Sequence, residues 1–357
     1  MSDDLSAEDR FRLEVLIAQD LRAVCIDETA MVLRALTGQG EASIPLVPNC
    51  RPDKYLRLIR ELLSGHALGS PGGYPVYLSR WTRHGQMEGL HLGKLLLTGE
   101  PEAVAAVAYS PALTDELAGH VWWIAPTIEN ARLMLRREAV ARGRMGRVLV
   151  AFLVEHLPFL QDDHLAIMDT VAVLLFSRAL DPEQIAGVWR RGRRCNTYYV
   201  AFLEMAALET ALPLPEPLPP HPDHATVAAT LATQLAGGDP RAQALARMLS
   251  AQGQTFLAAA AEVLTRPETQ EVVARTLNAI GRYVAGNAVW DDAAGIHAAD
   301  TCLSLAPRLE AVTRLARAGE ETLKPIFART TSIGSLMRHK IEPVVTPLMD
   351  DIRYLQG

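Results

Sequence analysis

Two arginine-rich stretches hold the side chains of this sequence that are best suited to bind anions. The first arginine island, residues 132–147, contains six arginines and a single acidic residue (Arg132, Arg136, Arg137, Arg142, Arg144, Arg147 and Glu138). The second arginine island, residues 189–199, places four arginines among aromatic residues (Trp189, Arg190, Arg191, Arg193, Arg194, Tyr198 and Tyr199). Guanidinium groups bind phosphates and carboxylates through paired hydrogen bonds, and aromatic rings stack on bases. Each island is therefore consistent with an RNA contact, a docking face for an acidic partner, or a solvated loop.

Two cysteines are candidates for a reactive thiol. Cys195 lies inside the second island, where neighbouring guanidinium groups stabilise a thiolate and raise its reactive fraction. Cys50 is expected in an exposed turn because prolines flank it at Pro48 and Pro52. The four cysteines of the chain are far apart and form no C-x-x-C pair (Cys25, Cys50, Cys195 and Cys302). This pattern indicates free thiols in a reducing compartment.

A glycine-rich loop at residues 69–73 is a third feature that can bind an anion, because its backbone N–H groups can surround a phosphate. The loop lacks the lysine and the strand-to-helix context of a nucleotide-binding loop, so a simple connector is the alternative. Arg80, Trp81 and Arg83 follow closely. If that stretch folds back on the loop, an anion pocket forms there.

The sequence shows none of the common motifs of enzymes or metal sites. Its ten histidines include no H-x-x-x-H or H-E-x-x-H spacing. There is also no G-x-S-x-G and no G-x-G-x-x-G after a strand. We therefore predict no metal and no cofactor, and no motif argues for an enzyme, although none excludes one.

Composition limits the classes of protein that remain. The 357 residues are 49% hydrophobic and 21% charged, which is typical of a globular chain of two or three domains. A formal net charge of −6 gives no reason to expect DNA as a partner. No apolar run approaches the roughly 18 residues that span a bilayer, and the start, Met1-Ser2-Asp3-Asp4, is acidic. We therefore expect a cytoplasmic protein without a membrane segment.

The elements that must position these side chains are mainly helical. Short β-prone runs at residues 23–27, 31–36 and 42–47 predict a small N-terminal β meander, which must pack on helices to be stable. From about residue 52 the apolar spacing is that of helices. Candidate helix pairs begin near residues 100, 127, 163 and 196, so an irregular HEAT-like stack and a non-repetitive helical domain both remain open.

A proline-rich stretch gives the clearest domain boundary. Residues 212–222 contain six prolines in eleven positions, which forbids a helix and predicts a linker or a packed strap rather than an SH3-type ligand. We therefore divide the chain into an N-terminal α+β segment, a helical and possibly HEAT-like domain, a proline-rich linker and a C-terminal helical bundle (residues 1–90, 91–210, 211–223 and 224–357). Within the bundle, Thr346-Pro347 is predicted to cap the last helix.

Two segments resemble a known family. One runs from Leu62 to Arg83 through Gly72-Gly73-Tyr74-Pro75, and the other runs from Glu100-Pro101-Glu102 through Thr114-Asp115-Glu116-Leu117 to Trp122-Trp123. They resemble the DsrS-type sulfur reduction proteins, which are encoded with the reverse dissimilatory sulfite reductase system of sulfur-oxidising bacteria. The resemblance covers residues 1–210 best. It implies a soluble cytoplasmic protein with an accessory or regulatory role in sulfur oxidation, and it assigns no functional residues.

Three functions follow as hypotheses. The leading one is an accessory protein of sulfur oxidation that binds a protein of that system through a helical surface. The second is an RNA-binding regulator that uses the arginine islands, whose binding should weaken steeply with salt. The third is a persulfide carrier or sulfurtransferase that uses the thiolate of Cys195 or Cys50.

Overall fold

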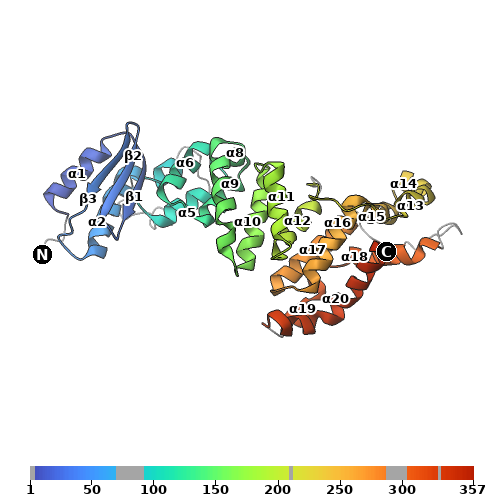
Figure 1. Cartoon of the computed structure of the whole chain (residues 1–357). Coiled ribbons are helices and arrows are strands. Elements are labelled where there is room, and N and C mark those ends of the chain that lie inside the picture. The colour runs from blue at the N-terminus through green and yellow to red at the C-terminus, as the bar shows by residue number, and fades with distance from the viewer. Residues whose placement is uncertain (1–4, 70–91, 209–211, 287–303, 329–330) are drawn as a thin grey trace. The chain divides into compact units, whose positions relative to one another are not determined.

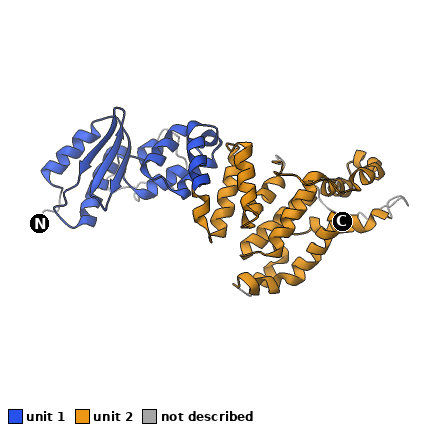
Figure 2. Ribbon diagram, viewed as in Figure 1, with its two compact units in different colours: residues 1–155 blue, residues 156–357 orange. Residues whose placement is uncertain are grey.

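The chain is mainly α-helical, with a small antiparallel sheet near its N-terminus that is followed by helices, as the sequence predicts (Figure 1). The structure is a computed structural model that describes residues 5–69, 92–208, 212–286, 304–328 and 331–357. These residues form two compact units, residues 1–155 and 156–357 (Figure 2). The division falls inside the segment 91–210 that the sequence suggests as one domain. Among the described helices, none combines the length and the apolar character that crossing a bilayer requires.

The sheet of unit 1 is a three-stranded meander that packs on two helices. Its strands are β1 (Leu21–Asp27), β2 (Val32–Thr37) and β3 (Gly40–Pro45), paired antiparallel in that order. Helices α1 (Ala7–Ile17) and α2 (Pro52–Leu68) complete a hydrophobic core with one face of the sheet. The buried Tyr55 hydroxyl donates to Asp9 Oδ2 at 2.7 Å, which satisfies a polar group inside this core. The predicted meander is thereby confirmed, and so is its need for helical support.

Short helices fill the rest of unit 1, and their caps follow from the sequence. They are α4 (Leu92–Leu95), α5 (Pro101–Tyr109), α6 (Asp115–Ile124), α7 (Ile128–Leu135), α8 (Glu138–Ala141) and α9 (Arg144–His156). Thr114 and Thr127 cap α6 and α7 with their side-chain oxygens. The Val24 N–H donates to Leu96 O at 2.9 Å, so the segment after α4 lies along the outer edge of β1.

The described secondary structure of unit 2 consists of helices, which are organised around one buried helix. Its elements are η2 (Leu157–Leu160), α10 (His164–Ser177), α11 (Pro182–Arg191), α12 (Thr197–Ala206), α13 (His224–Thr230), α14 (Ala232–Ala236), α15 (Pro240–Leu249), α16 (Ala251–Thr265), α17 (Gln270–Ala285), α18 (Ala306–Ala316), η4 (Glu320–Thr322), α19 (Lys324–Phe327) and α20 (Gly334–Gln356). Helix α12 is buried along nearly all its length and packs against α10, α16 and α17. Whether the helical pairs make a HEAT-like repeat stays a prediction.

An ion-pair cluster ties three of these helices together. Arg275 of α17 donates through Nε and Nη2 to both carboxylate oxygens of Glu204 on α12, at 2.7 and 2.6 Å. Its Nη1 donates to Asp169 on α10 at 2.7 Å. Because two donors meet one carboxylate side by side, this geometry is the strong bidentate form of the arginine–carboxylate pair.

The proline-rich stretch is part of unit 2 and packs on its helices. In the described residues 212–223, which we call the proline strap, the chain is not helical. Leu214 exchanges two hydrogen bonds with the Gln252 side chain, and the Leu218 N–H donates to Thr255 Oγ1 at 2.8 Å. Both partners lie on α16. Of the two predicted alternatives, a linker or a packed strap, the structure shows the packed strap.

One predicted helix start is wrong. The last helix, α20, begins at Gly334 and continues through Pro343 and Pro347, so Thr346-Pro347 does not cap it. Both prolines lie on the exposed side of the helix. The carbonyls that lose their N–H partners there, four residues earlier at His339 and Pro343, can bond to water instead.

Candidate functional site

The second arginine island spans the end of α11 and the start of α12. Asp181 and Gln184 form a capping box at the start of α11, with Pro182 in its first turn. Trp189 is only 6% exposed, because its ring packs against Tyr199 and Phe202 with centroid distances of 4.5 and 5.1 Å. Trp189 is therefore a core side chain, whereas the arginines next to it in the sequence lie nearer the surface.

Gly192 is required where the chain turns between the two helices. A Cβ atom at this position would lie 2.3 Å from Cε1 of Tyr199, well inside van der Waals contact. The backbone conformation itself is an ordinary one (φ −55°), so the requirement is for space and not for conformational freedom. The absence of a side chain lets Tyr199 pack directly under the arginine loop.

These residues border a cavity of about 350 Å³, which we call the Trp189 cavity. It lies among α11, α12, α16 and the proline strap. Ala258 and Ala259 of α16 contribute to its apolar lining, together with Leu218 of the strap, which is 43% exposed. The charged groups around it are Arg193, Glu216 and Glu262. The site thus combines an apolar floor with charges of both signs.

Glu216 neutralises part of the arginine island. Arg193 Nη2 lies 2.8 Å from Glu216 Oε2, and Arg190 Nε lies 3.8 Å from Glu216 Oε1. The backbone of Glu216 has a φ of +51°, which costs energy for a residue with a side chain and fixes its carboxylate against the two arginines. Arg194 is exposed and has no ion-pair partner within the described ranges. One guanidinium of the island therefore remains available to another molecule.

Tyr198 lies next to Arg191 on the inner side of the same turn. Burial raises the pKa of the Tyr198 hydroxyl, and the Arg191 guanidinium, which forms a hydrogen bond with it, opposes this shift. Burial likewise raises the pKa of Tyr199, and Arg193 opposes it. Both hydroxyls are thus held in their neutral, hydrogen-bonding form. Arg191 Nη1 is buried and finds no hydrogen-bond partner in the part of the chain that the structure describes.

The two candidate thiols lie in different units. Cys195 is half-buried at the turn before α12, and its carbonyl accepts from the Tyr198 N–H at 3.1 Å. Cys50 is half-buried rather than fully exposed, because it packs against the core of unit 1 while its thiol donates to Arg51 O at 3.7 Å. Neither thiol lines the Trp189 cavity. Their reactivity remains a prediction.

The first arginine island lies in unit 1, and half of its arginines serve structural contacts. Arg137 donates to Tyr109 O and stacks over the Tyr109 ring at 5.8 Å, while Arg132 and Arg142 pair with glutamates one turn away. Exposed side chains without a described ion-pair partner are those of Arg136, Arg144 and Arg147. The anion pocket predicted from Arg80, Trp81 and Arg83 lies outside the described residues.

Sequence reasoning missed the residues that complete the Trp189 cavity. Glu216 and Leu218 come from the proline strap and Glu262 from α16, all far from the island along the chain. The density of prolines identified the strap as non-helical, but no local signal shows which helix a strap packs on. The convergence of these segments appears only in the folded chain.

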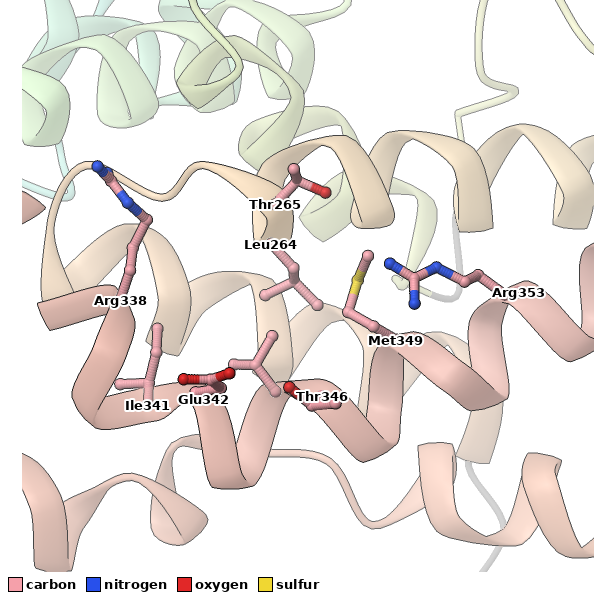
Figure 3. Close-up of a pocket in the computed structure, with 9 residues that line it drawn as sticks. Leu264, Thr265, Arg338, Ile341, Glu342, Thr346, Met349 and Arg353 are labelled. Atoms are coloured by element: carbon pink, nitrogen blue, oxygen red, sulfur yellow. The ribbon is translucent and has the colours of Figure 1, made fainter. Parts of the chain in front are cut away.

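A second cavity of unit 2, of about 260 Å³, lies between the end of α16 and the long helix α20 (Figure 3). Its apolar residues include Leu264, Ile341 and Met349, with Arg338 and Arg353 at its ends. It contains none of the arginine, aromatic or cysteine residues that the sequence suggests as site candidates.

Across the described ranges, no three His, Cys, Asp or Glu side chains gather closely enough to hold a metal ion. Comparison of the chain with protein-family models, with curated proteins and with solved structures found no match.

Proposed function

We propose that this chain is a non-enzymatic accessory protein that docks a protein partner at the Trp189 cavity. The observation that supports the proposal most is the composition of this cavity: an aromatic and apolar floor, an exposed leucine and the guanidinium of Arg193 at its rim. Aromatic and arginine side chains dominate the binding energy of protein interfaces, particularly around a central pocket. The assignment to a cytoplasmic role in sulfur oxidation rests on the resemblance to DsrS-type proteins.

The rim is arranged so that a partner can replace an internal contact. The Arg193 and Glu216 side chains are 67% and 38% exposed, and exposed ion pairs of this kind contribute only about 0–1 kcal/mol. A carboxylate on a partner can therefore compete for Arg193 at little cost. Arg194, the next residue along the chain, does not line the cavity, but it is exposed and has no ion-pair partner among the described residues. The geometry fits a segment that inserts one apolar side chain and carries an acidic residue beside it.

RNA is less well suited to this rim than an acidic protein segment. Glu216 and Glu262 both border the cavity, and their negative charges repel phosphates. An RNA site would require the arginines to dominate the local potential, whereas Glu216 already offsets two of them. RNA binding is therefore the alternative that the capture experiment below must be able to detect.

The test is affinity capture of the tagged, full-length protein from sulfur-oxidising cells, with each sample split into nuclease-treated and untreated halves. We expect a protein partner that is retained in both halves and is lost with Leu218→Asp or Arg193→Ala. The matched control is Leu336→Asp, which changes another exposed leucine (56%) on α20 that does not line the cavity.

Each other outcome opposes the proposal. A partner that survives all three substitutions places docking elsewhere. Material that is lost on nuclease treatment, and binding that falls steeply as salt rises, identifies an RNA-binding protein instead. A partner that is lost with Cys195→Ser but retained with Leu218→Asp favours the sulfur-carrier hypothesis.

A further inference from the structure

Unit 1 contains a partly enclosed cavity of about 320 Å³, which we call the β1 cavity. It lies between strand β1, the turn into α5, the end of α6 and the start of α7. Val24, Cys25 and Ile26 line it from the strand, Glu100 from the turn, and Asn130 from α7. None of these residues belongs to the arginine islands or to the Trp189 cavity, so its function is separate from the docking proposed above.

The strand contributes unpaired main-chain groups to the wall of this cavity. The Leu46 N–H donates to Met31 O, so these two residues form a hydrogen-bonded pair at the end of the ladder between β2 and β3. Such pairs recur at every second residue of an antiparallel ladder, so Leu33 also directs its main-chain N–H and C=O toward β3. Ile26 lies opposite Leu33 on β1 and must therefore direct its N–H and C=O away from β2. The bond from Val24 N–H to Leu96 O agrees with this register.

Three of these groups at the free edge, the N–H and C=O of Ile26 and the C=O of Val24, have no partner among the described residues. They stay unpaired although Ile26 is half-buried and Val24 is fully buried. More than nine in ten buried main-chain groups in native proteins are paired. A donor and two acceptors that stay unpaired at the edge of a cavity are therefore groups that a bound molecule can use.

Asn130 supplies an independent observation of the same kind. It is only 8% exposed, and its Nδ2 donates to Ala125 O at 3.0 Å, which fixes the orientation of the amide. Its Oδ1 then has no donor among the described residues, and the side chain lines the cavity. The Oδ1 is not one of the fully buried atoms without a partner, so it is accessible and can accept a hydrogen bond from a molecule in the cavity.

The charge of the cavity is negative. Glu100 is the charged residue among those described in its lining, and its side chain is 18% exposed. Arg60 lies 3.5 Å from Glu100 but is shared with Glu28 and with Gly99 O. Burial raises the pKa of Glu100 even against this guanidinium, so the carboxylate is incompletely compensated. Among the described residues the site therefore offers four acceptors (Glu100, Asn130 Oδ1 and the C=O groups of Val24 and Ile26), one of them anionic, against one free donor.

We propose that the β1 cavity binds a small molecule with a primary ammonium group next to a carboxylate or carbonyl, the chemistry of an α-amino acid. The ammonium donates to Glu100, Asn130 Oδ1 and the Val24 C=O, and the neighbouring oxygen accepts from the Ile26 N–H. A volume of about 320 Å³ lies at the lower end of the range for small-molecule pockets and suits a ligand of this size. Neutral ligands without the ammonium do not satisfy the acceptors.

Cys25 provides a reporter at the site itself. Its thiol donates to Ile124 O at 3.7 Å and accepts from Arg34 Nη2 at 3.6 Å, and the residue lines the cavity. A ligand in the cavity therefore shields it from a small alkylating reagent. Cys50 and Cys195 lie outside the cavity and act as internal controls in the same molecule.

The experiment alkylates the full-length protein with iodoacetamide and follows each cysteine by peptide mass spectrometry. The common L-amino acids are added one at a time, each beside its N-acetyl derivative, which lacks the ammonium. At about ten times its Kd, a binding amino acid should slow the alkylation of Cys25 about tenfold and leave Cys50 and Cys195 unchanged. Its N-acetyl derivative should give no protection, and the amino acid should also raise the thermal midpoint.

Variants locate the effect in the cavity. Asn130→Ala and Glu100→Gln should lose both the protection of Cys25 and the thermal shift, whereas Glu102→Gln, two residues further along the chain and exposed, should keep both. If no amino acid protects Cys25 or raises the midpoint, or if the variants respond like the wild type, the proposal is wrong. These results do not depend on Leu218 or Arg193, so they are distinguishable from failure of the docking proposal.

Discussion

The β1 cavity of unit 1 and the Trp189 cavity of unit 2 have similar volumes, about 320 and 350 Å³, but are built from different groups. The first is lined by main-chain atoms and by an asparagine that is almost fully buried. The second is bordered by long, exposed side chains whose charges already pair with one another. Unpaired groups that cannot move favour a small ligand of fixed shape, whereas exchangeable surface charges favour a flexible partner segment.

The comparison also predicts where substitutions are costly. A buried polar group that loses its partner costs about 1–3 kcal/mol, whereas an exposed ion pair contributes less than about 1 kcal/mol. Changes to the walls of either cavity should therefore affect stability, while changes to the Trp189 rim should affect binding alone. The following predictions, from the largest expected effect on stability to the smallest, test this difference.

Gly192→Ala should destabilise unit 2 by about 3 kcal/mol, because the new methyl group overlaps the Tyr199 ring and must displace it from Trp189. Urea denaturation measures this change, and partner capture should be lost with it. Gly187→Ala on the same helix is the matched control. Its Cβ meets nothing within 4 Å, so helix propensity alone should make it about 1 kcal/mol more stable. Equal behaviour of the two variants would contradict the close approach at Gly192.

Asn130→Ala should destabilise the protein by about 1–2 kcal/mol, because Ala125 O loses the hydrogen bond from Nδ2. The same substitution removes an acceptor from the β1 cavity, so amino acids should no longer raise the thermal midpoint. Partner capture through unit 2 should stay normal. A loss of capture in this variant would show that the two cavities do not act independently.

Glu100→Gln should change stability in a pH-dependent way. Burial raises the pKa of Glu100 in the folded protein. The protonated carboxyl therefore contributes fully to the free energy of unfolding below the pKa that Glu100 has in the unfolded chain. This contribution is lost as pH rises through the raised pKa of the folded protein. Glutamine stays neutral throughout. The variant should therefore gain stability relative to wild type between pH 4 and pH 7, measured by urea denaturation, whereas Glu102→Gln should show a much flatter difference.

Arg193→Ala should change stability by only about 0.5 kcal/mol, because both members of its pair with Glu216 are substantially exposed. Its effect should instead appear in binding, with about a tenfold loss of partner affinity in a titration with the captured protein. A stability loss as large as that of Gly192→Ala would mean that the rim is structural, and would remove the contrast between the two cavities.

Local patterns of the sequence were sufficient for much of the fold. Short β-prone runs predicted the strands of the meander, and the helices expected near residues 100 and 127 begin at Pro101 and Ile128. The same reasoning failed at Thr346-Pro347, because a proline stops a helix only where the carbonyl it frees has no other partner. In α20 both prolines face the exposed side, and the amphipathic stripe that buries Ile341 and Ile352 continues past them.

The sequence by itself determined which residues carry charge, that the chain is mainly helical after about residue 52 and that residues 212–222 are not helical. It identified Trp189 and the arginines beside it because their types and spacing are local properties. Only the tertiary structure decided that Glu216 neutralises two of those arginines, that Leu218 completes their cavity and that Cys25 lines another. Those contacts join segments far apart in the chain, and their partners are chosen by the packing of whole helices and by strand register, which no local pattern records.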